Sequence, residues 1–70
     1  MGLDFNFTTL TPDERLIEAH NIAEIIFNYC EPDDLAENER NIVVTFYKKL
    51  STTCSPAQLN WLRRIKDKYL

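Results

Sequence analysis

The chain has 70 residues and a mass of 8.3 kDa, with 44% hydrophobic and 27% charged residues and a formal net charge of −3. This length allows one domain, and this composition is globular rather than disordered. A single Gly and three Pro exclude a Gly-rich phosphate loop and a multi-stranded β-sandwich. The longest apolar runs are two to three residues, against the ~20 that a membrane span needs. We therefore expect a soluble, cytoplasmic protein without a membrane partner, whose small core leaves it only marginally stable.

The first ten residues alternate apolar and polar side chains, with Leu3, Phe5 and Phe7 separated by Asp4 and Asn6. A period of two is typical of extended backbone, but one strand alone cannot form a sheet. The pattern predicts an N-terminal arm over residues 1–10. The arm either covers the helices of its own chain, which we favour, or pairs with another chain.

A helix is predicted from about residue 12 to residue 30. Thr11 begins a capping box with Glu14, and Pro12 fits the first helical position because it has no N–H to leave unpaired. The helix should end at Glu31 because Pro32 disfavours helical geometry in the residue before it. At 100° per residue, one apolar arc collects Leu16, Ala19, Ile22, Ala23, Ile26, Phe27, Tyr29 and Cys30.

Two isoleucines of this helix fall on its polar side. Ile17 and Ile25 lie among Glu and Asn residues. They are either covered by the N-terminal arm or left for a partner. Ile17, Ile25, Phe5 and Phe7 together form a candidate partner surface.

A second helix is predicted over residues 34–50, with Asp34 as the N-cap and an apolar arc made of Leu35, Ile42, Val43, Phe46, Tyr47 and Leu50. Glu39 falls inside that arc. The alternative is that residues 33–38 form a separate turn and the helix begins near Asn38. Lys48 and Lys49 in the last turn suit the negative end of the helix dipole.

A third helix is predicted over residues 56–69. Ser55, Pro56 and Gln58 repeat the capping device of the first helix. Trp61 is expected at the centre of the buried face, which the other inward positions complete: Leu59, Leu62, Ile65 and Tyr69. The short connection after the second helix makes the last two helices a hairpin or a helix–turn–helix.

The sequence predicts no catalytic, cofactor or metal site. Cys30 and Cys54 are the only thiols and His20 the only imidazole, so a four-ligand zinc site cannot be completed. The cysteines are expected to be free rather than disulfide-bonded, and His20 to be a packed histidine rather than a general base. A nucleophile would need a base and an orienting group, and no such set is present. We therefore expect no enzyme activity and no cofactor.

Charge is divided unevenly along the chain. Residues 1–39 carry ten carboxylates and one cation, a formal charge of −9, whereas residues 40–70 carry +6. Such asymmetry can mark a nucleic-acid surface, or the acidic and basic elements can neutralise each other within the fold. The candidate nucleic-acid patch consists of Lys48, Lys49, Arg63, Arg64, Lys66 and Lys68.

The C-terminal half resembles a two-helix pattern of small, mostly uncharacterised phage, prophage and plasmid proteins. The similarity is carried by Ser55, Pro56, Gln58, Trp61 and Leu62, and continues to Ile65 and Tyr69. These are capping and core positions, so the resemblance implies a helical hairpin and a mobile-element setting, and it carries no activity. Residues 1–37 lie outside it.

The sequence thus predicts one all-α domain over residues 1–70, a three-helix bundle with an N-terminal arm. The favoured function is a non-enzymatic protein-binding or regulatory module, such as a phage accessory protein that binds a host or phage complex or associates with itself. Acidic helices can dock on basic surfaces, including surfaces that otherwise hold nucleic acid. The alternative is nucleic-acid binding through the basic C-terminal helix.

Overall fold

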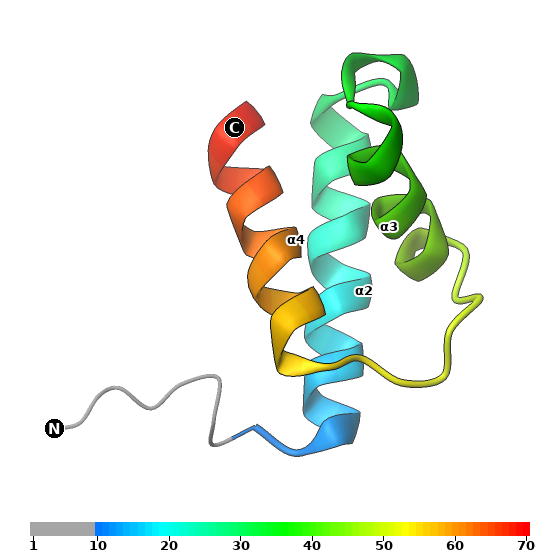
Figure 1. Cartoon of the computed structure of the whole chain (residues 1–70), viewed down its shortest axis with the longest axis vertical. Helices are drawn as coiled ribbons and strands as arrows, with labels where there is room; N and C mark the ends of the chain where they lie inside the picture. The colour runs from blue at the N-terminus through cyan, green and yellow to red at the C-terminus, as the bar shows by residue number, and fades with distance from the viewer. Residues whose placement is uncertain (1–9) are drawn as a thin grey trace, which may run out of the picture.

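The computed structural model describes residues 10–70, which form three α-helices and one 3₁₀ turn (Figure 1). The helices are α2 (Pro12–Tyr29), α3 (Glu37–Tyr47) and α4 (Pro56–Tyr69), and the turn η1 (Pro32–Asp34) precedes α3. No strand occurs in residues 10–70. The predicted all-α three-helix bundle is therefore confirmed, and the predicted arm, apart from Leu10, lies outside the described residues.

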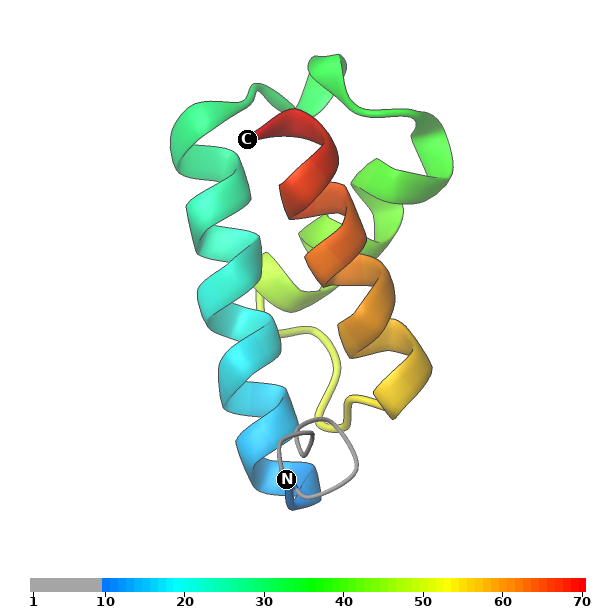
Figure 2. The same cartoon turned by 90° about the vertical axis from the view of Figure 1, so that its left-hand side faces the viewer.

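The longest helix, α2, packs against both of the others, whereas α3 and α4 contact each other over fewer residues. Figure 1 shows α4 and α3 on either side of α2, and the view turned by 90° shows α4 lying along α2 (Figure 2). The chain runs up α2, down α3 and up α4. The α3–α4 side of the bundle is consequently the most open one.

Both predicted capping boxes are present. Thr11 Oγ1 accepts the Glu14 N–H at 3.1 Å, and Glu14 Oε1 accepts the Thr11 N–H at 2.9 Å. Ser55 and Gln58 make the same reciprocal pair at 3.1 and 2.9 Å. Each box satisfies two N–H groups that a helix start would otherwise leave unpaired. These signals place the first residues of α2 and α4 where the sequence predicted them.

The predicted second helix is wrong at both ends, since α3 spans Glu37–Tyr47 rather than residues 34–50. Asp34 does not cap it: its Oδ2 accepts the Glu31 N–H at 3.0 Å and closes η1. The next two residues are extended, and the Ala36 N–H is donated to Glu39 Oε1 at 3.0 Å. The alternative of a separate turn before the helix therefore describes this segment.

The end of α3 is set by Lys49, whose φ of 57° lies in the left-handed region. The Leu50 N–H reaches the Thr45 carbonyl at 2.8 Å and the Lys49 N–H reaches the Phe46 carbonyl at 3.2 Å. This pair of bonds is a Schellman motif, in which a left-handed residue reverses the chain after the last turn. Leu50 thus leaves the helix and is exposed.

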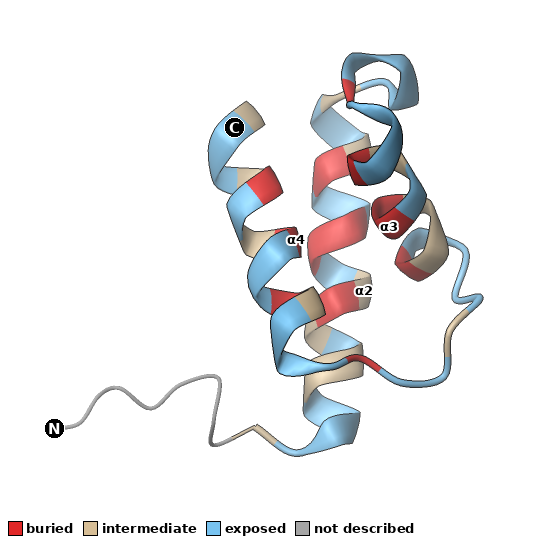
Figure 3. Cartoon of the chain, viewed as in Figure 1, coloured by how far each residue is buried: buried red, intermediate tan, exposed pale blue. Residues whose placement is uncertain are grey.

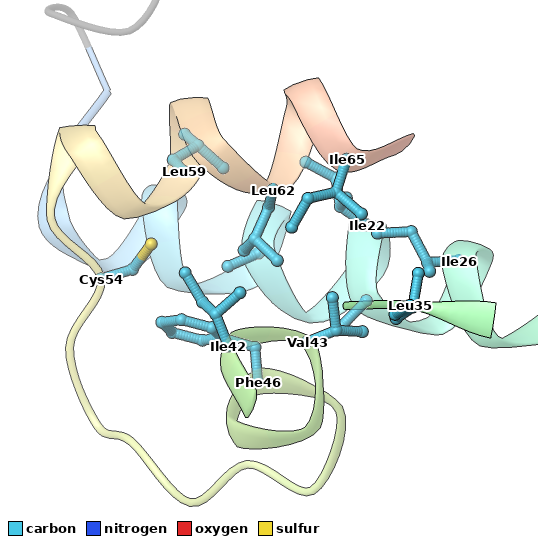
Figure 4. Close-up of a cluster of buried hydrophobic side chains, with 12 residues drawn as sticks. Ile22, Ile26, Leu35, Ile42, Val43, Phe46, Cys54, Leu59, Leu62 and Ile65 are labelled. Carbon is cyan, nitrogen blue, oxygen red and sulfur yellow. The ribbon is translucent and has the colours of Figure 1, made fainter. Parts of the chain in front are cut away.

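One hydrophobic core lies between the three helices (Figures 3 and 4). Leu35 and Cys54 reach it from the two connections, although neither belongs to an α-helix. Four residues predicted on buried faces are instead exposed, namely Tyr29, Tyr47, Leu50 and Trp61, of which Trp61 is described below. Tyr29 and Tyr47 are the last residues of their helices, and Leu50 lies beyond the end of α3. The helical core residues are Ala19, Ile22, Ala23, Ile26, Ile42, Val43, Phe46, Leu59, Leu62 and Ile65.

Arg15 ties the start of the bundle to the connection between α3 and α4. Its Nε donates to the Cys54 carbonyl at 2.8 Å and its Nη1 donates to the Leu10 carbonyl at 3.0 Å. One planar guanidinium therefore bonds two backbone segments that are far apart in sequence. This contact holds the connection beside the first turn of α2.

Candidate protein-interaction surfaces

The outward face of α2 consists of six exposed residues: Glu14, Ile17, Asn21, Glu24, Ile25 and Asn28. It points away from the core because the buried positions of α2 are Ala19, Ile22, Ala23 and Ile26. Ile17 is 59% exposed and Ile25 is 37% exposed, so neither is covered by residues 10–70. The two isoleucines predicted to lie on the polar side do so. Phe5 and Phe7, the other members of the candidate partner surface, lie outside the described residues.

No Lys or Arg belongs to the outward face of α2. The one cation of this helix, Arg15, is turned toward the Leu10 and Cys54 carbonyls. Glu14 and Glu24 therefore give the face a negative charge around its two isoleucines. An apolar surface that carries charge of one sign favours a partner of the opposite sign.

Four of the six residues of the predicted nucleic-acid patch are bonded to carboxylates or lie beside them. Arg63 is bonded to Glu18 at 3.0 Å, on the side of α2 that faces α4. Lys49 lies in a hollow with His20 and Glu24, on the side of α2 that faces α3. Lys66 lies beside Glu18 and Asp67. Carboxylates are thus interleaved with these cations, which lowers the positive potential that phosphates would meet.

Lys68 is held in a small polar cluster with Glu39 and Tyr69. Glu39 is only 8% exposed, and its carboxylate accepts Lys68 Nζ at 3.0 Å and Tyr69 Oη at 2.8 Å. The hydrogen bond from Tyr69 is the largest cause that lowers the pKa of Glu39, followed by the bond from Lys68 and that from the Ala36 N–H. The same carboxylate raises the pKa of Lys68. This cluster explains how Glu39 occupies an otherwise apolar arc.

Trp61 is not the buried centre of α4, contrary to the prediction. It is 36% exposed, and the fully buried residues of the helix are Leu59, Leu62 and Ile65. The indole lies on the edge of α4 that faces α3, where it lines a groove together with Phe46. Because α3 and α4 meet over few residues, this edge stays open. The groove contains the large aromatic residue that sequence reasoning had assigned to the core.

His20 and Cys30 are partly buried in the bundle, and Cys54 is buried. The His20 ring is partly buried against Phe46, with ring centroids 6.5 Å apart. Cys30 and Cys54 are both free, and burial raises the pKa of the Cys54 thiol. Within the described part of the chain, no three His, Cys, Asp or Glu residues are grouped to hold a metal ion. None of the helices in residues 10–70 combines the length and the apolar character that crossing a membrane requires.

The sequence did not predict two structural features of this protein. The groove between α3 and α4 was not foreseen, because it depends on how far apart the two helices lie. The Glu39 cluster was signalled by the one carboxylate within an apolar arc, but its partners come from a helix 29 and 30 residues further on. Comparisons of the chain with protein-family models, curated proteins and solved structures found no match.

Proposed function

We propose that this protein is a small non-enzymatic protein-binding module that docks on a basic surface of a partner through the outward face of α2. The observation that carries the proposal is the exposure of Ile17 and Ile25 on a face whose charges are all negative. Apolar side chains at the centre of such a face supply burial on binding, and the carboxylates around them steer a basic partner. The resemblance of the C-terminal half to small phage, prophage and plasmid proteins supports a role as an accessory protein of a mobile element.

A protein partner is favoured over nucleic acid by the arrangement of the cations. Binding to duplex DNA draws its affinity from several phosphate contacts by Lys and Arg. Here Arg63 and Lys68 are paired with carboxylates, and Lys49 and Lys66 each lie beside one. Nucleic-acid binding through α4 is the alternative. A salt titration against duplex and single-stranded oligonucleotides tests it, because each neutralised phosphate adds about −0.9 to the log–log slope on duplex.

The proposal is tested by photo-crosslinking in the native cell. A photoreactive amino acid replaces Asn21, which lies between the two isoleucines on the outward face of α2, or Ala57, which is exposed on α4. We expect a specific protein adduct from position 21 and none from position 57. The identified partner, once purified, should bind the Ile17→Ser/Ile25→Ser double variant at least about tenfold more weakly, a loss of ~1.4 kcal/mol.

Two further results decide the outcome. Binding should weaken as salt is raised, since exposed charges are screened. Both isoleucines are exposed, so circular dichroism of the double variant should match that of the parent chain. Equal adducts from both positions, an adduct to nucleic acid, or unchanged affinity of the folded double variant would contradict the proposal.

A further inference from the structure

The groove between α3 and α4 has a volume of about 360 Å³. Asn38, Asn41 and Thr45 line it along one row of α3, at spacings that place them on the same side of the helix. Gln58 and Trp61 line it from α4, with the buried residues Ile42 and Phe46 beneath. The groove therefore combines an apolar floor with side-chain amides at its edges. Its size is at the lower end of the range for ligand pockets, which suits one or two large side chains.

Polar groups at the edges are available to a ligand. Gln58 Oε1 accepts the Ser55 N–H, which leaves the Gln58 amide nitrogen without an acceptor in residues 10–70. The Asn41 side chain makes no hydrogen bond with those residues, since it is the Asn41 backbone carbonyl that accepts Thr45 Oγ1. Free amide groups beside an apolar floor fit the backbone N–H and C=O groups of a bound segment.

One exposed cation of α4, Arg64, lies one helical turn from Trp61. Arg64 follows Trp61 by three residues, so it is the next residue in the same row of α4, and it is exposed. Within residues 10–70 it forms no ion pair, whereas Lys68, one turn further on, is bonded to Glu39. Trp and Arg are the residues most enriched where binding energy is concentrated in interfaces. An exposed guanidinium favours a carboxylate because the two can form parallel hydrogen bonds.

We propose that this groove is a second docking site, which binds a short acidic segment of another protein. The segment places one large apolar side chain against Trp61 and a carboxylate beside Arg64. The site is independent of the outward face of α2, because α2 contributes no residue to the groove. The molecule then carries an acidic face for a basic partner and, on α3 and α4, a groove for an acidic segment. Such a pair of surfaces lets one small domain link two proteins.

A single nearby unpaired cation favours a peptide over nucleic acid at this groove. Stacking of a base on Trp61 would supply one contact, but tracking of the phosphate backbone needs a positively charged groove. Arg64 alone does not provide one, and Lys68 is already engaged by Glu39.

The test selects ligands with the full chain as bait. A phage-displayed library of random 12-residue peptides is enriched on the wild-type protein and depleted on the Trp61→Ala variant, whose fold is first checked by circular dichroism. We expect the surviving peptides to share an aromatic or aliphatic residue next to Asp or Glu. Because Trp61 is the only Trp of the chain, its fluorescence then reports binding of the synthetic peptides directly.

Charge-reversed variants provide the matched control. Arg64→Glu should weaken the binding of the selected peptides about tenfold or more, which corresponds to ~1.4 kcal/mol of binding free energy. Lys66→Glu changes the same charge on the other side of α4, beside Glu18 and Asp67, and should change the affinity less than about twofold. The Ile17→Ser/Ile25→Ser variant should bind the peptides normally. A result that contradicts docking through the outward face of α2 can thus be distinguished from a result that contradicts peptide binding in the groove.

Several results would overturn the proposal. These are a selection without acidic peptides, equal effects of Arg64→Glu and Lys66→Glu, and a Trp61 signal that responds to single-stranded oligonucleotides but not to peptides. A Trp61 signal that follows protein concentration, with dimers in sedimentation, would assign the groove to a second copy. A signal that changes when residues 2–9 are deleted would assign it to the chain's own N-terminal segment.

Discussion

Glu39 shows how a single ionised side chain is accommodated at a buried position of so small a domain. Three donors reach its carboxylate, namely Tyr69 Oη, Lys68 Nζ and the Ala36 N–H. A buried carboxylate without such donors would take up a proton or destabilise the fold. The cluster thereby fixes the start of α3 and joins it to the last turn of α4.

The Glu39 cluster makes the free energy of unfolding depend on pH in the acidic range. The pKa of Glu39 is lowered in the folded chain from its ordinary value of 4.5, so the unfolded chain takes up the proton first as the pH falls. The stabilisation is complete above about pH 4.5 and decreases below it, through the lowered pKa. We expect Glu39→Gln to destabilise the protein at pH 7 by about 1–2 kcal/mol in urea unfolding.

The exposed neighbour Glu37 offers the matched control, since Glu37→Gln removes the same charge two residues earlier. The free-energy difference between wild type and Glu39→Gln should shrink between pH 5 and pH 3, whereas Glu37→Gln should follow wild type. Equal stability of the two variants at pH 7 would show that the cluster contributes nothing to folding.

At the scale of the elements, the ends of α3 show what local sequence can and cannot specify. The capping boxes at Thr11 and Ser55 need only residues three apart, and the sequence predicted both helix starts correctly. Leu35 continues the apolar spacing of α3 although it lies before the helix, so periodicity alone extended the predicted helix. Leu50 also fits the apolar spacing, so it extended the predicted helix past the true end of α3. Lys49 is not a residue typical of left-handed backbone, which left that end without a signal.

Trp61 shows a second limit of predicting burial from the sequence of a helix. The sequence prediction placed Trp61 at the centre of the buried face of α4, but helical spacing does not say how close the neighbouring helix comes. The structure leaves the α3-facing edge of α4 open because both helices pack mainly on α2. The position of Ile17 and Ile25 on the polar side of α2, in contrast, was predictable, since helical spacing already set them among polar residues.

The left-handed residue at the end of α3 leads to a stabilising substitution. A side chain with a Cβ costs roughly 1–2 kcal/mol in this conformation, and Gly costs nothing there but loses more entropy on folding. Lys49→Gly should therefore raise the free energy of unfolding by about 0.5–1 kcal/mol. Lys48→Gly is the control, because Lys48 has a φ of −89° and gains nothing from Gly. Equal melting temperatures for the two variants would contradict the Schellman end of α3.

Across the whole molecule, the two connections are part of the core rather than loops laid over it. Leu35 is buried before α3 and Cys54 is buried before α4, where Arg15 also holds the Cys54 carbonyl. The core contains residues from every described element except η1. We therefore expect residues 10–70 to unfold as one cooperative unit.

The Cys54 thiol reports directly on that cooperativity. In a Cys30→Ser chain, Cys54 is the only thiol, and it is buried with a pKa raised mainly by desolvation. Both effects slow its reaction with a thiol reagent, because the reactive thiolate is scarce and shielded. The labelling rate should rise with urea in parallel with the loss of helical circular dichroism. The complementary Cys54→Ser chain, with only the half-buried Cys30, should label much faster in the absence of urea. If Cys54 instead reacts as fast as Cys30 in the folded protein, the connection between α3 and α4 opens locally, and unfolding is not a single step.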